Sequence, residues 1–86
     1  MQLLKLKVLA EAGAVCDIEV NHDAAEGWTV QVTYATRRGE RCEPLERQRG
    51  GVRTFATLDA VARTLAGLGL SGFRVNAAGL PGEEPP

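Results

Sequence analysis

The sequence predicts a small α+β fold, with one antiparallel sheet packed by helices in the order α-β-β-β-α-β. Three observations support it. Apolar residues recur at helical spacing between residues 58 and 68, and two polar–apolar alternations lie between residues 15 and 36. The 86 residues, 44% of them hydrophobic, leave room for one small core. We expect a single domain over residues 1–78 and a disordered tail rich in Pro and Glu over residues 79–86.

The first segment, residues 3–13, carries two competing periods. Alternation from Leu4 to Val8 suits a strand, whereas the Leu, Lys, Ala and Glu content favours a helix. A helix would place Leu3, Leu6, Leu9 and Ala10 on one face, and Gly13 would stand at the position of a left-handed C-cap. We therefore predict a short helix over residues 3–12, with a strand as the alternative.

Two strands are predicted next, joined as an antiparallel hairpin. Residues 15–21 alternate so that Cys16, Ile18 and Val20 share the core side. Residues 28–36 alternate in the same way, and the residues expected inside are Trp28, Val30, Val32 and Tyr34. The polar loop between the two runs is short, which favours a hairpin.

After a turn at residues 37–40, the segment 41–49 is too polar for a central strand. It reads as an edge strand or an ordered arm whose charges discourage pairing with other molecules. Gly50 and Gly51 then predict either a tight turn or a bulge before a short extended piece at residues 52–56.

The second helix has the clearest signal in the chain. Thr57 is the expected N-cap, and Asp59 in the first turn complements the helix dipole. The residues that form the apolar stripe across the sheet are Leu58, Val61, Ala62, Leu65 and Leu68. A last short strand is expected at residues 73–76.

No catalytic constellation emerges from the sequence. The single histidine, His22, lies beside Asp23 and is predicted to be a solvated loop residue. Cys16 is expected to be a core thiol and Cys42 a surface thiol, so a small redox protein is the less favoured hypothesis. The glycines at 67, 69 and 72 match a dinucleotide-binding pattern, but they end a helix instead of opening one. We expect no enzyme, no cofactor and no bound metal.

Arginine is concentrated between residues 37 and 53, which we call the arginine arm. This segment holds six arginines against three acids in a chain whose net charge is −1. We predict that these arginines bind a partner protein or DNA, because a guanidinium suits carboxylates and phosphates. They are Arg37, Arg38, Arg41, Arg47, Arg49 and Arg53. The alternative is a solvated edge, and the slightly acidic balance of the whole chain argues against strong independent DNA binding.

Several stretches resemble the small ParC-type partition-associated proteins of plasmids and integrative elements, which are distinct from the topoisomerase subunit of that name. The resemblance covers most of residues 3–78, and it is carried by residues 3–15, 27–28, 48–55, 58–59, 68–70 and 73–75. It implies an accessory protein that contacts a partition ATPase, a DNA-binding partner or DNA. It transfers no catalytic residue.

The leading hypothesis is therefore a non-catalytic interaction protein in the partition or maintenance of mobile DNA. The N-terminus lacks the long apolar region of a signal peptide, so we expect a cytoplasmic protein with no membrane association. A homodimer is compatible with this hypothesis. The alternative is a small inhibitor of the anti-defence type, encoded by a mobile element.

Overall fold

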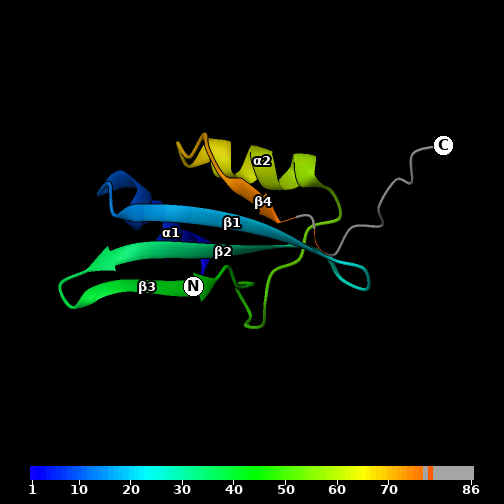
Figure 1. Ribbon diagram of the computed structural model, residues 1–86, viewed down its shortest axis with the longest axis horizontal. Coiled ribbons are helices and arrows are strands. Elements are labelled where there is room, and N and C mark those ends of the chain that lie inside the picture. Colours follow the sequence, from blue (N-terminus) through cyan, green and yellow to red (C-terminus); the bar gives the residue numbers. More distant parts are fainter. Residues whose placement is uncertain (77, 79–86) are drawn as a thin grey trace.

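The computed structural model describes residues 1–76 and 78, and its elements follow the predicted α-β-β-β-α-β order (Figure 1). They are α1 (Leu3–Glu11), β1 (Val15–Asp23), β2 (Gly27–Thr36), β3 (Gly39–Pro44), α2 (Leu58–Gly67) and β4 (Arg74–Asn76). This confirms the α+β class. The tail predicted at residues 79–86 lies outside the described residues. Within the described part, no helix has both the length and the apolar character needed to cross a bilayer.

The four strands form one sheet in the order β3-β2-β1-β4. The first three are antiparallel neighbours, but β4 runs parallel to β1, with Val75 opposite Val20. The sheet is therefore mixed, where the sequence had predicted an antiparallel one. The reason is the connection through α2, because a helical crossover lets β4 run in the same direction as β3 on the opposite edge of the sheet.

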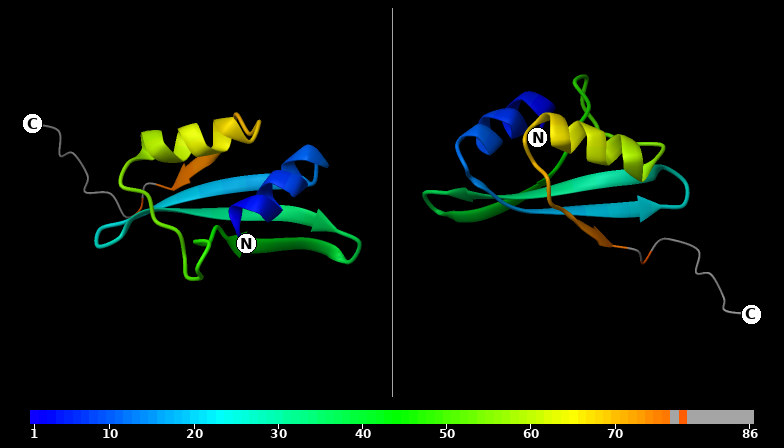
Figure 2. Two further views of the ribbon diagram at one scale, coloured as in Figure 1. Left: turned by 180° about the vertical axis from the view of Figure 1, so that it is seen from behind. Right: turned by 90° about the horizontal axis from the view of Figure 1, so that it is seen from above.

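The core lies between the sheet and the two helices, which cover the same face of the sheet (Figure 2). The side chains that are completely buried there are Leu6, Val20, Val30, Val32, Leu45, Val61 and Leu65. Ile18 and Tyr34 are buried beside them, as the alternation of the two strands predicts. Burial of these apolar side chains is the main contribution to the stability of the fold.

Both helices are placed as the sequence predicts. Leu6 is the buried residue of α1, and Gly13 has the left-handed φ of +68° expected of its cap. At the start of α2, the backbone N–H of Ala60 donates to Thr57 Oγ1 at 3.1 Å. Val61 and Leu65 then point from α2 into the core.

Cys16 is exposed, so its predicted place in the core is wrong. The pairing between β1 and β2 shifts register between Val15 and Asp17, which inserts one extra residue into β1. Such a bulge interrupts the alternation of a strand. The alternation resumes at Ile18, and Val15 packs against the core in the place where Cys16 was expected.

His22 differs from its predicted position, whereas Trp28 lies on the core side of the sheet as predicted. His22 was predicted to be a solvated loop residue, but it lies in β1 and is half-buried. The centre of its ring lies 4.8 Å from that of Trp28, in an edge-to-face arrangement. Trp28 packs against the core from its margin and is only partly buried. The Trp28 backbone N–H donates to the Phe55 carbonyl, and the Phe55 N–H donates to the Trp28 carbonyl, both at 2.8 Å. This pairing attaches the segment before α2 to the start of β2.

The segment predicted as a polar edge strand or arm consists of a strand and an anchored loop. β3 is an exposed edge strand, as expected, but Leu45 directly after it is completely buried. A tight turn then forms at Gly50 and Gly51, in which the Arg47 N–H donates to the Gly51 carbonyl at 2.8 Å. Both glycines have positive φ, +93° and +81°, which settles the earlier alternative in favour of a turn.

Candidate functional site

The arginine arm does not form one surface, because β3 separates its members into two groups. Arg37 and Arg38 lie in the turn between β2 and β3, and Arg41 follows in β3; these three line one hollow, and we call this end of the hairpin the hairpin tip. The other three arginines lie in the loop at residues 45–53, beyond the far end of β3. Six strand residues span roughly 17–20 Å, so the two groups are at opposite ends of that strand.

The hairpin tip is a rigid turn around a hollow. Thr36 Oγ1 donates to the Gly39 carbonyl at 2.6 Å and accepts from the Arg38 backbone N–H at 3.2 Å. Gly39 has a φ of +117°, which favours glycine. The hollow has a volume of about 370 Å³, and its lining residues are Tyr34, Thr36, Arg37, Arg38 and Arg41.

The loop at residues 45–53 is tied to the start of α1, and Arg53 is held by an aromatic contact beside it. The Arg53 guanidinium lies 4.9 Å from the centre of the Phe55 ring, a cation–π contact. Gln2 Nε2 donates to the carbonyl of Gln48 at 3.1 Å, which ties the loop to the start of α1. Between them is a hollow of about 320 Å³, which we call the α1–loop hollow; its lining residues are Gln2, Leu3, Leu4, Glu46, Gln48 and Arg53.

The arginines of the arm carry charge that the rest of the described chain does not neutralise. None of the six forms an ion pair with a residue in 1–76 or 78. Arg74, by contrast, binds Asp17 at 2.6 Å and Glu19 at 3.1 Å, and this contact lowers the pKa of the Asp17 carboxyl. Arg63 binds Asp59 in the same helix. The six guanidinium groups of the arm therefore remain available to an external anion.

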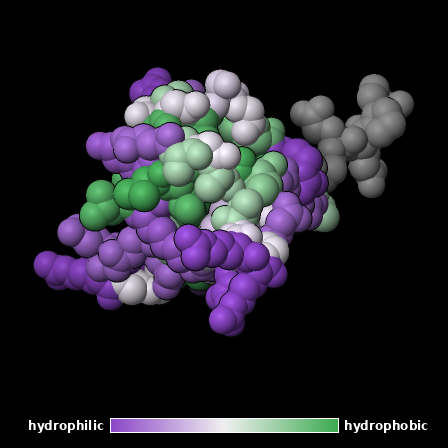
Figure 3. Space-filling model, turned by 90° about the vertical axis from the view of Figure 1, so that its left-hand side faces the viewer, coloured by the Kyte–Doolittle hydropathy of each residue, from purple (hydrophilic) through white to green (hydrophobic). Residues whose placement is uncertain are grey.

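An apolar ridge on α1 is the surface feature that the sequence analysis did not single out. Leu4 and Val8 are 73% and 57% exposed and lie one helical turn apart. Figure 3 shows apolar side chains gathered above a belt of hydrophilic ones at this end of the molecule. The sequence does contain a sign of this ridge, because a helix that buries Leu6 places Leu4 and Val8 outside the buried stripe. We call these two residues the α1 ridge.

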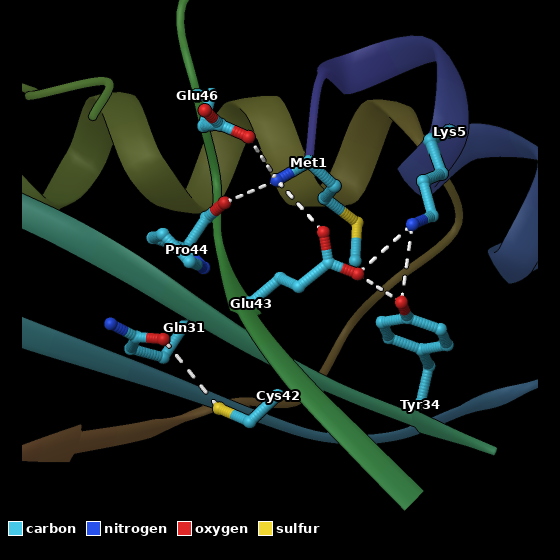
Figure 4. Close-up of polar contacts among 8 residues, drawn as sticks. All are labelled: Met1, Lys5, Gln31, Tyr34, Cys42, Glu43, Pro44 and Glu46. Atoms are coloured by element: carbon cyan, nitrogen blue, oxygen red, sulfur yellow. Dashed lines mark hydrogen bonds and ion pairs between the residues drawn. The ribbon is translucent and has the colours of Figure 1, made fainter. Parts of the chain in front are cut away.

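A polar cluster fastens α1 to the sheet (Figure 4). Lys5 Nζ lies 2.9 Å from Glu43 Oε2 and 3.1 Å from the Tyr34 hydroxyl, which itself donates to the same carboxylate. The amino group of Met1 donates to the Pro44 carbonyl at 2.6 Å. Sequence patterns do not show this cluster because its members are separated by up to 43 residues.

The Glu43 carboxylate holds the centre of the cluster as an anion. The hydrogen bond from Tyr34, followed by the one from Lys5, lowers its pKa from 4.5 to about 2. The same contacts raise the pKa of Lys5, its bond with Glu43 having the largest effect. A carboxyl group whose pKa is lower in the folded than in the unfolded protein stabilises the fold at pH values above its unfolded pKa. This stabilisation is lost as the pH falls through the pKa of the folded state.

We therefore expect Glu43→Gln to lower the urea midpoint at neutral pH, and we expect parent and variant to converge as pH falls from about 4.5 to about 2. The parent loses its carboxylate contacts in that window, whereas the variant has none to lose. Urea titrations monitored by Trp28 fluorescence at several pH values measure the difference. Glu26→Gln, in the exposed β1–β2 turn, is the control with the same charge change. A difference that stays constant down to pH 2 would contradict the role of the carboxylate.

The two thiols are free, and both are exposed. A hydrogen bond with Glu40 is the main cause that raises the pKa of Cys16, which lowers the thiolate fraction at neutral pH. Cys42 Sγ lies 3.5 Å from Gln31 Oε1 on the face of the sheet away from the helices. The environment of Cys16 does not favour nucleophilic chemistry.

No protein-family model, curated protein or solved structure matches this chain. The surfaces of the described residues that could bind a ligand are the α1 ridge, the α1–loop hollow and the two groups of arginines.

Proposed function

We propose that this chain is a non-catalytic accessory protein in the partition or maintenance of mobile DNA, and that it binds a partner protein through α1 and the loop at residues 45–53. The association with mobile DNA rests on the sequence resemblance to ParC-type proteins. The mode of action rests on the surface described above. A partition ATPase or a DNA-binding protein is the partner that this function requires, in the cytoplasm.

The observation that carries the proposal is the continuity between apolar and cationic groups at the α1–loop hollow. Leu4 is 73% exposed and lines the same hollow as Arg53. Protein interfaces combine an apolar centre with a polar rim, and arginine is enriched in them. Leu4 and Val8 supply the centre, while Arg47, Arg49 and Arg53 supply a rim that attracts an acidic partner.

The hollow is also held in place before any partner arrives. The Arg53 N–H donates to the Leu45 carbonyl at 2.9 Å, and Leu45 itself is completely buried. On the other side, Glu46 N donates to the Met1 carbonyl. A preformed surface loses less conformational entropy on binding than one that must be ordered.

Replacement of Leu4 and Val8 by serine tests this proposal. The parent is used to capture a partner from host extract, the partner is identified by mass spectrometry, and the affinity is then measured with both purified proteins. We expect the double variant to bind at least about tenfold more weakly, because both side chains would bury apolar surface against the partner and serine loses that contribution. Val75→Ser is the control, because Val75 is 42% exposed but lies on β4, away from α1.

The arginine rim is tested separately by the triple change Arg47→Gln, Arg49→Gln and Arg53→Gln. We expect slower association with the acidic partner and a weaker dependence on salt.

Equal binding by the parent and the α1 ridge variant would contradict the proposed surface. Capture of a defence-system component instead of a partition or DNA-binding protein would favour the anti-defence alternative, and self-association alone would indicate a homodimer.

A further inference from the structure

The hairpin tip differs from the α1–loop hollow in its chemistry. Three arginines converge on one hollow of about 370 Å³, in which the ring of Tyr34 is the only large nonpolar surface. Leu4, an exposed aliphatic side chain that would anchor a protein partner, lines the other hollow. We propose that the hairpin tip binds the phosphate backbone of nucleic acid. This goes beyond the proposed partner-protein interface, which uses a different set of residues.

The acids nearest to the tip do not neutralise it. Glu40 and Arg41 are consecutive residues of β3, so their side chains point to opposite faces of the sheet. Arg41 lies opposite Tyr34 on the face that carries the helices, whereas Glu40 contacts Cys16. The next acid along the strand, Glu43, is already balanced by Lys5 at 2.9 Å and by the amino group of Met1 at 3.6 Å.

The tip is also accessible and preorganised. It lies at one end of the long axis of a molecule that measures 50 × 26 × 23 Å over the chain, where the β2–β3 turn projects (Figure 1). Arg37, Arg38 and Arg41 are all exposed. The Thr36–Gly39 bond at 2.6 Å fixes the turn from which they extend.

Among the described residues, the lining of the tip contains no exposed aliphatic side chain, which favours a nucleic acid backbone over an acidic protein surface as the ligand. Arginine donates to phosphate in a planar fork, and three such groups match the repeated charges of a nucleic acid backbone. The polar lining offers no base-specific pocket, so we expect binding without sequence preference. Because the whole chain carries a net charge of −1, we expect the contact to be confined to the tip and to weaken steeply as salt is raised.

The test compares two triple variants that each remove three positive charges. One changes Arg37, Arg38 and Arg41 to Gln, and the other changes Arg47, Arg49 and Arg53. Fluorescence anisotropy with a labelled mixed-sequence DNA duplex is measured between 50 and 200 mM salt. If the tip binds phosphates, the tip variant should bind at least about tenfold more weakly and lose about two to three units of salt slope. The loop variant should stay within about one unit of the parent slope.

A third variant, with lysine at positions 37, 38 and 41, keeps the charge and should retain most of the salt slope. If the glutamine variant fails to fold, the lysine variant takes its place in the test. A lower affinity than that of the parent, with the same dependence on salt, would then support the role of the guanidinium fork. No binding by the parent, or equal weakening in both triple variants, would overturn the proposal. Tight binding of polyglutamate in place of DNA would overturn it in favour of a carboxylate-bearing protein.

Failure of this test leaves the partner-protein interface unaffected, since that interface is measured with the Leu4 and Val8 variant and a protein ligand. The two results together separate a bridging protein, which holds DNA at the tip and a partner at α1, from a protein with one binding surface.

Discussion

Replacement of Leu45 by alanine should lower the free energy of unfolding by about 2–5 kcal/mol. Leu45 is completely buried, and its N–H donates to the Val30 carbonyl at 2.8 Å. The substitution removes apolar contacts and leaves a cavity beneath the loop at residues 45–53. The expected effect is large because Leu45 is the only side chain of that loop in the core.

Urea unfolding monitored by Trp28 fluorescence measures this loss, and Leu4→Ala is the matched control. Leu4 is 73% exposed, so the same chemical change there should cost less than about 0.5 kcal/mol. A similar loss in the two variants would show that the loop is not anchored through Leu45.

Replacement of Gly27 by alanine should cost about 2–4 kcal/mol, for two reasons. Gly27 has a φ of +93°, which strains any residue with a Cβ. A Cβ at that position would also lie 2.5 Å from the carbonyl oxygen of Phe55, which belongs to the backbone. That oxygen accepts from the Trp28 N–H, so the segment before α2 would have to move away from β2.

Gly50→Ala separates the two causes. Gly50 has the same φ of +93°, but nothing lies within 4 Å of the position that its Cβ would occupy. Only the backbone strain remains, which costs about 1–2 kcal/mol. Thermal and urea unfolding of both variants give the comparison. Equal losses would mean that the contact with Phe55 contributes nothing.

The parts of the fold that the sequence predicts are those set by local patterns. Thr57 caps a helix that buries Val61 and Leu65, and both features lie within one short segment. The alternation of Val30, Val32 and Tyr34 likewise fixes which face of β2 is buried. Such signals depend on neighbours in sequence and need no knowledge of the tertiary structure.

The predictions that were wrong, or only partly right, depended on contacts between distant segments. One bulge residue displaced Cys16 from the core, and no local pattern marks its position. A single apolar residue, Leu45, stands among charged neighbours, so periodicity does not reveal its burial. The direction of β4 is set by the crossover through α2, which a pattern of three residues cannot encode.

The sequence predicts which arginines make up the candidate site, but it does not predict how they are arranged in space. The sequence identifies the concentration of arginine, and the structure leaves all six without an ion pair among the described residues. Their division into two groups follows from the length of β3, which a charge count does not contain. The helical pattern around Leu6 predicts the buried stripe of α1, but Leu4 and Val8 lie outside that stripe and the pattern does not predict their exposure as a ridge.

The parallel pairing of β4 with β1 also bears on the order in which the chain folds. The hairpins β1–β2 and β2–β3 join neighbouring segments, whereas Glu19 pairs with Arg74, which lies 55 positions later in the chain. Closing a long loop costs more conformational entropy than closing a short one, so such contacts form late. The three-stranded meander therefore has time to form during synthesis, while the edge of β1 stays open until residue 76 has left the ribosome. During that interval the backbone groups of β1 that later bind β4 are exposed to pairing with other chains.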